Sequence, residues 1–167
     1  MHFVIFGLSI SSSWGNGHAT IWRGLLKAMA SPCHTASFYE KDVSYYANTR
    51  DGWQCPPGVH LRLYESFDAV RDEAQRELDY ADVALGTSYC PDGPRASRLV
   101  LDARAAIRAF YDLDTPVTLD AVRAGTPVAY LPPEDLGSHQ NARFGVSRTP
   151  RFMAPHRAPR RVLWHTC

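Results

Sequence analysis

One histidine stands where a catalytic base is useful, at the end of a glycine-containing loop. Residues 15–18 read Gly-Asn-Gly-His, and we expect a helix to begin near His18. The first turn of a helix carries a partial positive charge, which disfavours the imidazolium ion and keeps the ring neutral. A neutral imidazole can accept a proton from a substrate. His18 is therefore the candidate catalytic residue; the alternative is an ordinary surface or hydrogen-bonding histidine.

The loop before His18 offers groups that can bind a ligand. Glycines allow close approach to the backbone, and successive N–H groups there favour an anion. The dinucleotide fingerprint G-x-G-x-x-G is absent, because Thr20 stands where its third glycine is required. Serine hydroxyls can bind a polar substrate and a tryptophan can stack on a sugar ring, or these groups can serve only the loop. The candidate binding residues are Ser12, Ser13, Trp14, Gly15, Asn16 and Gly17.

Two carboxylates form a second candidate group. Asp112 and Asp114 follow an apolar strand expected at 106–111, and the period of two along a strand places them on the same side. Such a pair can bind a divalent metal that carries a diphosphate, or it can hold sugar hydroxyls. The alternative is loop capping before the Thr115-Pro116 step.

A third group follows another expected strand, at 82–87. Ser88, Tyr89 and Asp92 come directly after it. Because the carboxyl ends of parallel strands share one edge, these side chains are expected to line the same crevice as the aspartates. Ordinary turn chemistry is the competing interpretation.

The elements that must position these residues alternate between strand and helix. This alternation predicts an α/β fold, a Rossmann-like three-layer domain with a mostly parallel sheet and helices on both faces. Apolar runs predict strands at 3–6, 35–39, 59–64, 82–87, 106–111 and 128–131. Helical patterns cover 18–30, 67–80, 95–105 and 117–124.

The periodicity also predicts which helix faces are buried. In the first helix, the apolar stripe is expected to run through Ile21, Leu25, Ala28 and Met29. In the 67–80 helix it is expected to run through Val70, Ala74 and Leu78, with Ser66 or Asp68 at the N-cap.

The charge of the chain divides it into two parts. Residues 1–137 carry twelve basic and all seventeen acidic residues, whereas residues 138–167 carry six arginines and no acid. We therefore expect a domain at 1–137 and a basic tail at 138–167 that is disordered. The tail is either a basic arm that binds an anionic partner, or sequence unrelated to the domain, of the kind that a frame shift or a truncation produces. Its composition favours the second interpretation.

Composition narrows the function classes. No run approaches the length of apolar sequence that a membrane helix requires, and no basic region precedes the first strand as in a signal peptide. The four cysteines form no C-x-x-C pair, which argues against structural zinc. These features predict a cytoplasmic protein without a membrane span.

Several separated motifs resemble one enzyme family. The segments FGLSISSSWGNGHATIWRGLLKAM, FYEKDVSYYANTRD, DVALGTSYCPDG and FYDLDTPVTLDAVRAGTPVAYLPPEDLG occur in this order. Together they resemble the amino-terminal domain of CgeB-type GT-B glycosyltransferases over residues 1–137. The resemblance implies a Rossmann-like domain on the acceptor side of a two-domain enzyme, with a second, carboxyl-terminal domain that holds the nucleotide sugar.

The resemblance also bears on the candidate residues. It implies that Gly15, Gly17 and His18 face the centre of sugar transfer. Because the fold generally works without a metal, it moves Asp112 and Asp114 toward acceptor or interdomain contacts. After Gly137 the family would continue into the donor domain, so we expect a truncated enzyme that is weak or inactive alone.

The leading functional hypothesis is transfer of a hexose from a nucleoside diphosphate sugar to an acceptor hydroxyl. It requires no cofactor beyond that co-substrate, and its partners are a small-molecule or glycan acceptor and the missing donor domain. One alternative is a transferase that uses Mn²⁺ or Mg²⁺ bound to Asp112 and Asp114. Another is a non-enzymatic Rossmann-like binding module. Nucleic-acid binding through the arginine tail is the least favoured hypothesis.

Overall fold

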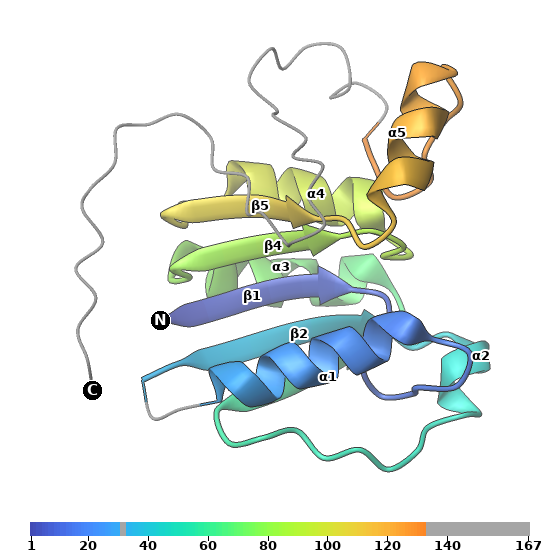
Figure 1. The fold of residues 1–167 in the computed structure, drawn as a ribbon. Coiled ribbons are helices and arrows are strands. Elements are labelled where there is room, and N and C mark those ends of the chain that lie inside the picture. The colour runs from blue at the N-terminus through green and yellow to red at the C-terminus, as the bar shows by residue number, and fades with distance from the viewer. Residues whose placement is uncertain (31–32, 133–167) are drawn as a thin grey trace.

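The computed structural model describes residues 1–30 and 33–132, and the expected tail at 138–167 lies outside this part of the chain. The described residues form one five-stranded parallel sheet flanked by helices (Figure 1). The predicted α/β three-layer fold is confirmed. The strand order is β3-β2-β1-β4-β5. The strands are β1 (His2–Gly7), β2 (Thr35–Lys41), β3 (Val59–Tyr64), β4 (Val83–Thr87) and β5 (Ile107–Tyr111).

The longer helices divide between the two faces of the sheet. Helix α1 covers one face, whereas α3 and α4 cover the other (Figure 1). The short α2 and the terminal α5 lie beyond the carboxyl ends of the strands. The helices are α1 (Gly17–Met29), α2 (Ser44–Ala47), α3 (Phe67–Asp79), α4 (Gly93–Asp102) and α5 (Thr115–Arg123). No helix in the described ranges combines the length and the apolarity needed to cross a bilayer.

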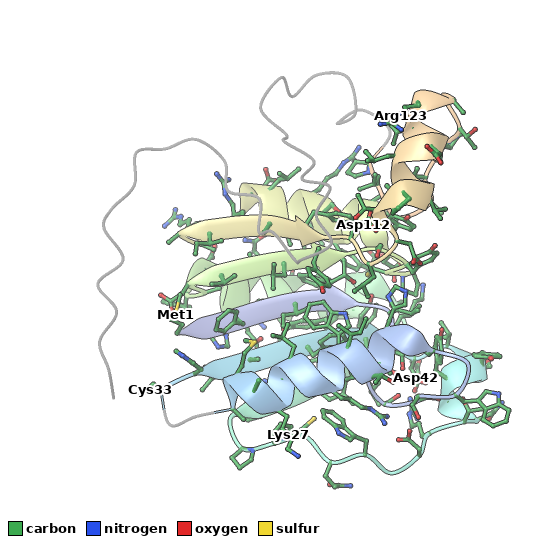
Figure 2. The ribbon with its side chains drawn as sticks, viewed as in Figure 1. Met1, Lys27, Cys33, Asp42, Asp112 and Arg123 are labelled. Atoms are coloured by element: carbon green, nitrogen blue, oxygen red, sulfur yellow. The ribbon has the colours of Figure 1, made fainter. Side chains whose placement is uncertain are left out.

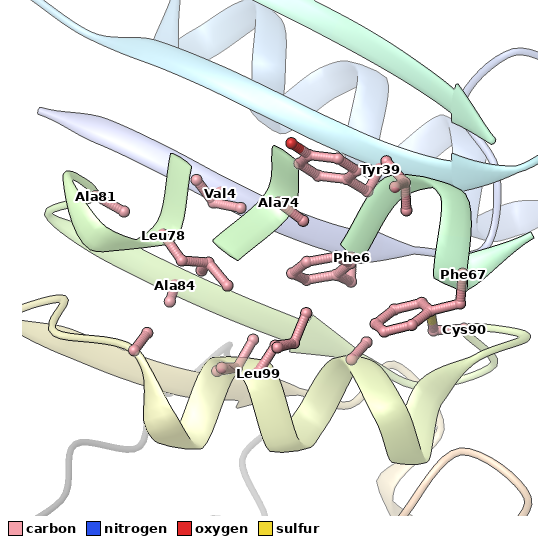
Figure 3. Packing of buried hydrophobic residues seen from close by; sticks show 14 of the residues in the cluster. Val4, Phe6, Tyr39, Phe67, Ala74, Leu78, Ala81, Ala84, Cys90 and Leu99 are labelled. Atoms are coloured by element: carbon pink, nitrogen blue, oxygen red, sulfur yellow. The ribbon is translucent and has the colours of Figure 1, made fainter. Parts of the chain in front are cut away.

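The core beneath α3 and α4 is built from alternate residues of the central strands. Val4 and Phe6 of β1 are fully buried, and the Phe6 ring stacks on Tyr39 of β2 at 5.0 Å between centroids. Figure 3 shows these side chains facing Leu78 of α3 and Leu99 of α4. The predicted stripe of α3 is confirmed, since its residues Val70, Ala74 and Leu78 are buried.

On the opposite face, the predicted stripe of α1 is wrong. Ala19, Trp22 and Leu26 are the buried residues of this helix, whereas Ile21 is 47% exposed. Trp22 packs edge-on against Phe38, 5.6 Å between centroids. The face that buries the indole removes far more apolar surface from water than the face through Ile21.

The predicted strand at 128–131 is also wrong. This segment is a turn, in which the amide of Leu131 donates to the carbonyl of Val128 at 3.0 Å. Pro127 and Pro132 flank it and lack the N–H that a sheet ladder requires. Two of its residues are nevertheless buried, since Tyr130 and Leu131 are each 7% exposed.

Candidate functional site

The candidate site lies at the carboxyl edge of the sheet, where the chain leaves β1, β4 and β5. The connection after β1 leads toward β2 on one side, and the connection after β4 leads toward β5 on the other. Open α/β sheets bind ligands where the strand order diverges in this way. In Figure 2 Asp112 lies at this end of β5.

His18 is placed there by the start of α1. Asn16 is the N-cap, and its side-chain oxygen accepts from the amide of His18 at 3.0 Å and from that of Ala19 at 3.4 Å. The side chain of His18 is 15% exposed. Its Nε2 lies 3.9 Å from Oδ2 of Asp114, and its ring meets the edge of Tyr89 at 5.1 Å between centroids.

The surroundings of His18 keep its ring neutral. Burial lowers the pKa of His18, and the nearby carboxylates of Asp114 and Asp112 offset only part of this effect. The carboxylate of Asp114 favours the tautomer that carries its hydrogen on Nε2. Nδ1 is buried and has no hydrogen-bonding partner among the described residues. The lone pair on Nδ1 is then the one that no described residue uses.

The two aspartates reach this place in a different way from the one predicted. Strand β5 ends at Tyr111, so the period of two along a strand does not apply to them. A turn brings them together instead, because Oδ1 of Asp112 accepts from the amide of Asp114 at 3.1 Å. Oδ2 of Asp112 is buried without a hydrogen-bonding partner in the described ranges, whereas the Asp114 side chain is 49% exposed.

The residues after β4 separate into two places. Tyr89 lies beside His18 and adopts a left-handed backbone with φ of 62°, which is strained for a residue other than glycine. Ser88 is fully buried, and its Oγ accepts from the amide of Leu113 at 3.0 Å. Asp92 instead pairs with Lys41 of β2, with Oδ2 3.1 Å from Nζ. Of the three, Tyr89 alone presents its side chain to His18.

Most polar groups of the loop before α1 are used within the protein. The Ser12 hydroxyl donates to the carbonyl of Thr49 at 2.8 Å, and the Ser13 hydroxyl donates to Asp51 at 2.6 Å. Asn16 serves as the N-cap. The indole of Trp14 is free to meet a ligand, since it is 67% exposed.

The structure favours glycine at position 15 for reasons that do not apply at position 17. Gly15 has a φ of 59°, and a Cβ there would lie 2.9 Å from the Tyr45 hydroxyl, so this turn favours glycine. A Cβ on Gly17 would meet nothing within 4 Å. Gly17 therefore leaves open space at the start of α1.

Sequence reasoning missed Glu40, which organises the loop after β1. Its carboxylate is fully buried and accepts from the amides of Ile10 at 2.6 Å and Ser11 at 3.0 Å. The Ser9 hydroxyl adds a bond at 2.9 Å. Glu40 lies at the end of an apolar strand, and its sequence neighbours suggest only a polar residue that terminates the strand. The local sequence therefore does not indicate that Glu40 is buried.

An ion pair between Arg23 and Asp51, which sequence reasoning also missed, fastens this loop to α1. The guanidinium of Arg23 binds both oxygens of Asp51, at 2.8 and 2.7 Å, and its Nε donates to the carbonyl of Ile10 at 2.8 Å. These hydrogen bonds, together with those from Ser13, hold the pKa of Asp51 well below its usual range. The ring of Trp53 lies 5.1 Å from the guanidinium carbon.

In residues 1–30 and 33–132, no cluster of three or more histidine, cysteine, aspartate or glutamate side chains is arranged to hold a metal ion. Comparison with family models, with curated proteins and with solved structures finds no match for this chain.

Proposed function

We propose that this chain is the acceptor-binding half of a glycosyltransferase, in which His18 and Asp114 activate an acceptor hydroxyl. The observation that carries this proposal is the encounter of a neutral, half-buried imidazole with a carboxylate at the point where the sheet order diverges. A histidine oriented by a carboxylate is suited to remove a proton from a hydroxyl group.

In the proposed step, a local opening exposes the buried Nδ1 of His18, which then takes the proton of the acceptor hydroxyl. The freed oxygen forms a bond to the anomeric carbon of the donor sugar, and the bond from that carbon to the diphosphate oxygen breaks. The electron pair leaves with the nucleoside diphosphate. Asp114 stabilises the imidazolium that forms, because its negative charge favours the charged form of the ring and so acts to raise the pKa of His18.

Two further groups fit an acceptor sugar. Oδ2 of Asp112 is buried without a hydrogen-bonding partner in the described part of the chain. Once a local opening admits the acceptor, a sugar hydroxyl that donates to this oxygen supplies the hydrogen bond that it lacks. Trp14 offers an exposed indole, and aromatic faces pack well against the apolar face of a sugar ring. The donor nucleotide belongs, in this proposal, to a second domain.

Nuclear magnetic resonance of the full chain tests the proposal. The ring signals of His18 are followed while methyl glycosides of glucose, galactose, mannose and N-acetylglucosamine are added in turn. At least one glycoside is expected to shift these signals, and Asp112→Asn is expected to weaken its binding. The matched control is Asp102→Asn, at the far end of α4.

Two results would overturn the proposal. One is a folded chain whose His18 signals respond to none of the glycosides. The other is binding of a nucleoside diphosphate that appears only with Mn²⁺ or Mg²⁺ and disappears in Asp112→Asn, which assigns the aspartates to a metal-dependent nucleotide site instead.

A further inference from the structure

Tyr130 connects the elements that carry the two members of the proposed pair. Its ring is 7% exposed and lies 5.0 Å from the ring of Tyr89, which in turn meets His18 edge-on. Its hydroxyl is 2.6 Å from Oγ1 of Thr118 on α5, the helix that begins directly after Asp114. Tyr130 thus contacts Tyr89, which packs against His18, and also Thr118, which lies on the helix that follows Asp114.

The turn that carries Tyr130 is held in place by its surroundings. Its ring stacks on Phe110 of β5, 6.2 Å between centroids and 13° between planes. Its backbone presses on the start of α4, where a Cβ on Gly93 would lie 2.6 Å from Cα of Tyr130. Thr118 is itself 1% exposed. Tyr130 therefore sits between α4, α5 and β5, rather than at a frayed end.

Tyr89 needs such support. A left-handed backbone is strained for a residue other than glycine and persists only where the surroundings hold it. The ring of Tyr130 and the imidazole of His18 both pack against the Tyr89 ring, and the carboxylate of Asp114 lies beside its hydroxyl. Without Tyr130, Tyr89 can relax away from His18, and the imidazole then becomes more exposed to water.

We propose that Tyr130 is a positioning residue: it holds Tyr89 against His18 and, through Thr118, fixes the start of α5 with Asp114. Tyr130 does not touch the reacting atoms in this scheme. The inference concerns the same site as the proposed function and relies on it for the role of the pair. The arrangement itself can be tested without any substrate.

The test is an NMR titration of His18 in the full chain and in three variants. In Tyr130→Leu, loss of the aromatic ring is expected to move the pKa of His18 up toward that of an ordinary histidine, because burial is the main cause of its lowered value. Asp112, Asp114 and Tyr89 remain as the groups that face the ring. Tyr130→Phe keeps the ring packing and is expected to rescue most of the shift.

The third variant, Thr118→Val, removes the hydroxyl partner of Tyr130 and is expected to resemble Tyr130→Phe. The matched control is Val117→Ala on the same helix, where the side chain is 62% exposed and no change is expected. Circular dichroism confirms that each variant is folded. A folded Tyr130→Leu variant with an unchanged His18 titration overturns the inference.

These outcomes are separable from those for the proposed function. If the His18 titration moves as expected but no glycoside binds, the positioning role stands and the acceptor site falls. If a glycoside binds but the titration is unchanged in Tyr130→Leu, the acceptor site stands and the positioning role falls. If Tyr130→Leu does not fold, Tyr130→Phe and Thr118→Val decide, and His18 titrations in both that are unchanged from that of the native chain would contradict the link to α5.

Discussion

Nε2 of His18 and Oδ2 of Asp114 lie 3.9 Å apart, although His18 belongs to α1 and Asp114 precedes α5. The sheet order explains the encounter, because β1 and β5 flank β4 and all strands run in parallel. The charge of Asp114 acts on an imidazole whose pKa burial has lowered.

Removal of that charge should lower the pKa of His18 further. In Asp114→Asn the opposing effect of burial remains, while the largest favourable contribution to the imidazolium is lost. An NMR titration of the His18 ring measures this. Asp120→Asn is the control, since Asp120 lies on the outer part of the same helix with its side chain 76% exposed. An unchanged or raised pKa in Asp114→Asn would contradict the assignment.

The lowered pKa of His18 should also appear in the pH dependence of stability. Below the ordinary histidine value, the unfolded chain takes up a proton at this position more readily than the folded chain does. His18 therefore contributes stability in full above about pH 6.5 and loses it as the pH falls through that value.

The measurement compares urea unfolding of the native chain and of His18→Gln at about pH 7.5 and 5.5. The native chain is expected to lose more stability on acidification than the variant does. Because every other titrating group is common to both proteins, the difference isolates His18. Equal losses in the two proteins would show that the folded and unfolded chains bind this proton alike.

Glu40→Gln should weaken the whole loop that precedes α1. The buried carboxylate accepts from two backbone amides and from serine hydroxyls, and a glutamine turns one acceptor atom into a competing donor. Hydrogen bonds to charged groups are worth about 1.5–3 kcal/mol each, so a loss of about 2 kcal/mol or more is expected in urea unfolding. Glu65→Gln, at an exposed position, should change stability little. Equal stability of the two variants would count against the structural role of Glu40.

The sequence predicts the five strands of the sheet well, because their signals are local. Val59–Tyr64 is observed at the predicted bounds, and α3 begins at Phe67 after Ser66, whose hydroxyl caps the amide of Ala69 at 3.4 Å. An apolar run or a capping residue contains this information by itself. The short α2 has no side-chain cap and no buried residue, and it left no such signal.

The predictions failed where contacts between residues distant in the sequence determine the structure. The buried face of α1 depends on the contact of Trp22 with Phe38, whereas periodicity alone favoured the face through Ile21. In the site, topology was enough to expect the residues that follow β4 at the same edge of the sheet as the aspartates. Glu40 and Tyr130 could not be assigned, because a glutamate after a strand and a tyrosine between prolines gain their roles only from the chain that packs around them.

Asp51→Asn should alter acid unfolding. The guanidinium of Arg23 and the Ser13 groups lower the pKa of Asp51 in the folded chain, so its contribution is present above the unfolded value and is lost as the pH falls below about 4. The native chain should therefore lose more stability than Asp51→Asn between neutral pH and acid. Asp79→Asn on the exposed end of α3 is the control. If the native chain loses no more stability in acid than Asp51→Asn does, the ion pair contributes nothing to the free energy of unfolding.

Two glycine substitutions should act in opposite directions, because their surroundings differ. A Cβ on Gly93 would lie 2.6 Å from both Cα and the carbonyl oxygen of Tyr130, and backbone atoms cannot yield as a flexible side chain can. Gly93→Ala is therefore expected to destabilise the fold by about 1–3 kcal/mol, in the range of overpacked cores. Gly24 lies in the middle of α1 with nothing within 4 Å of a built Cβ.

Gly24→Ala should stabilise the fold by about 0.5–1 kcal/mol, since alanine loses less backbone freedom in a helix. Urea unfolding measures both changes. Gly93→Ala should in addition shift the ring signals of Tyr130 and Tyr89, whereas Gly24→Ala should leave them in place. If Gly93→Ala were as stable as the native chain with unaltered tyrosine signals, α4 and the Tyr130 turn would be less closely packed than described, and the support of Tyr89 would need another source.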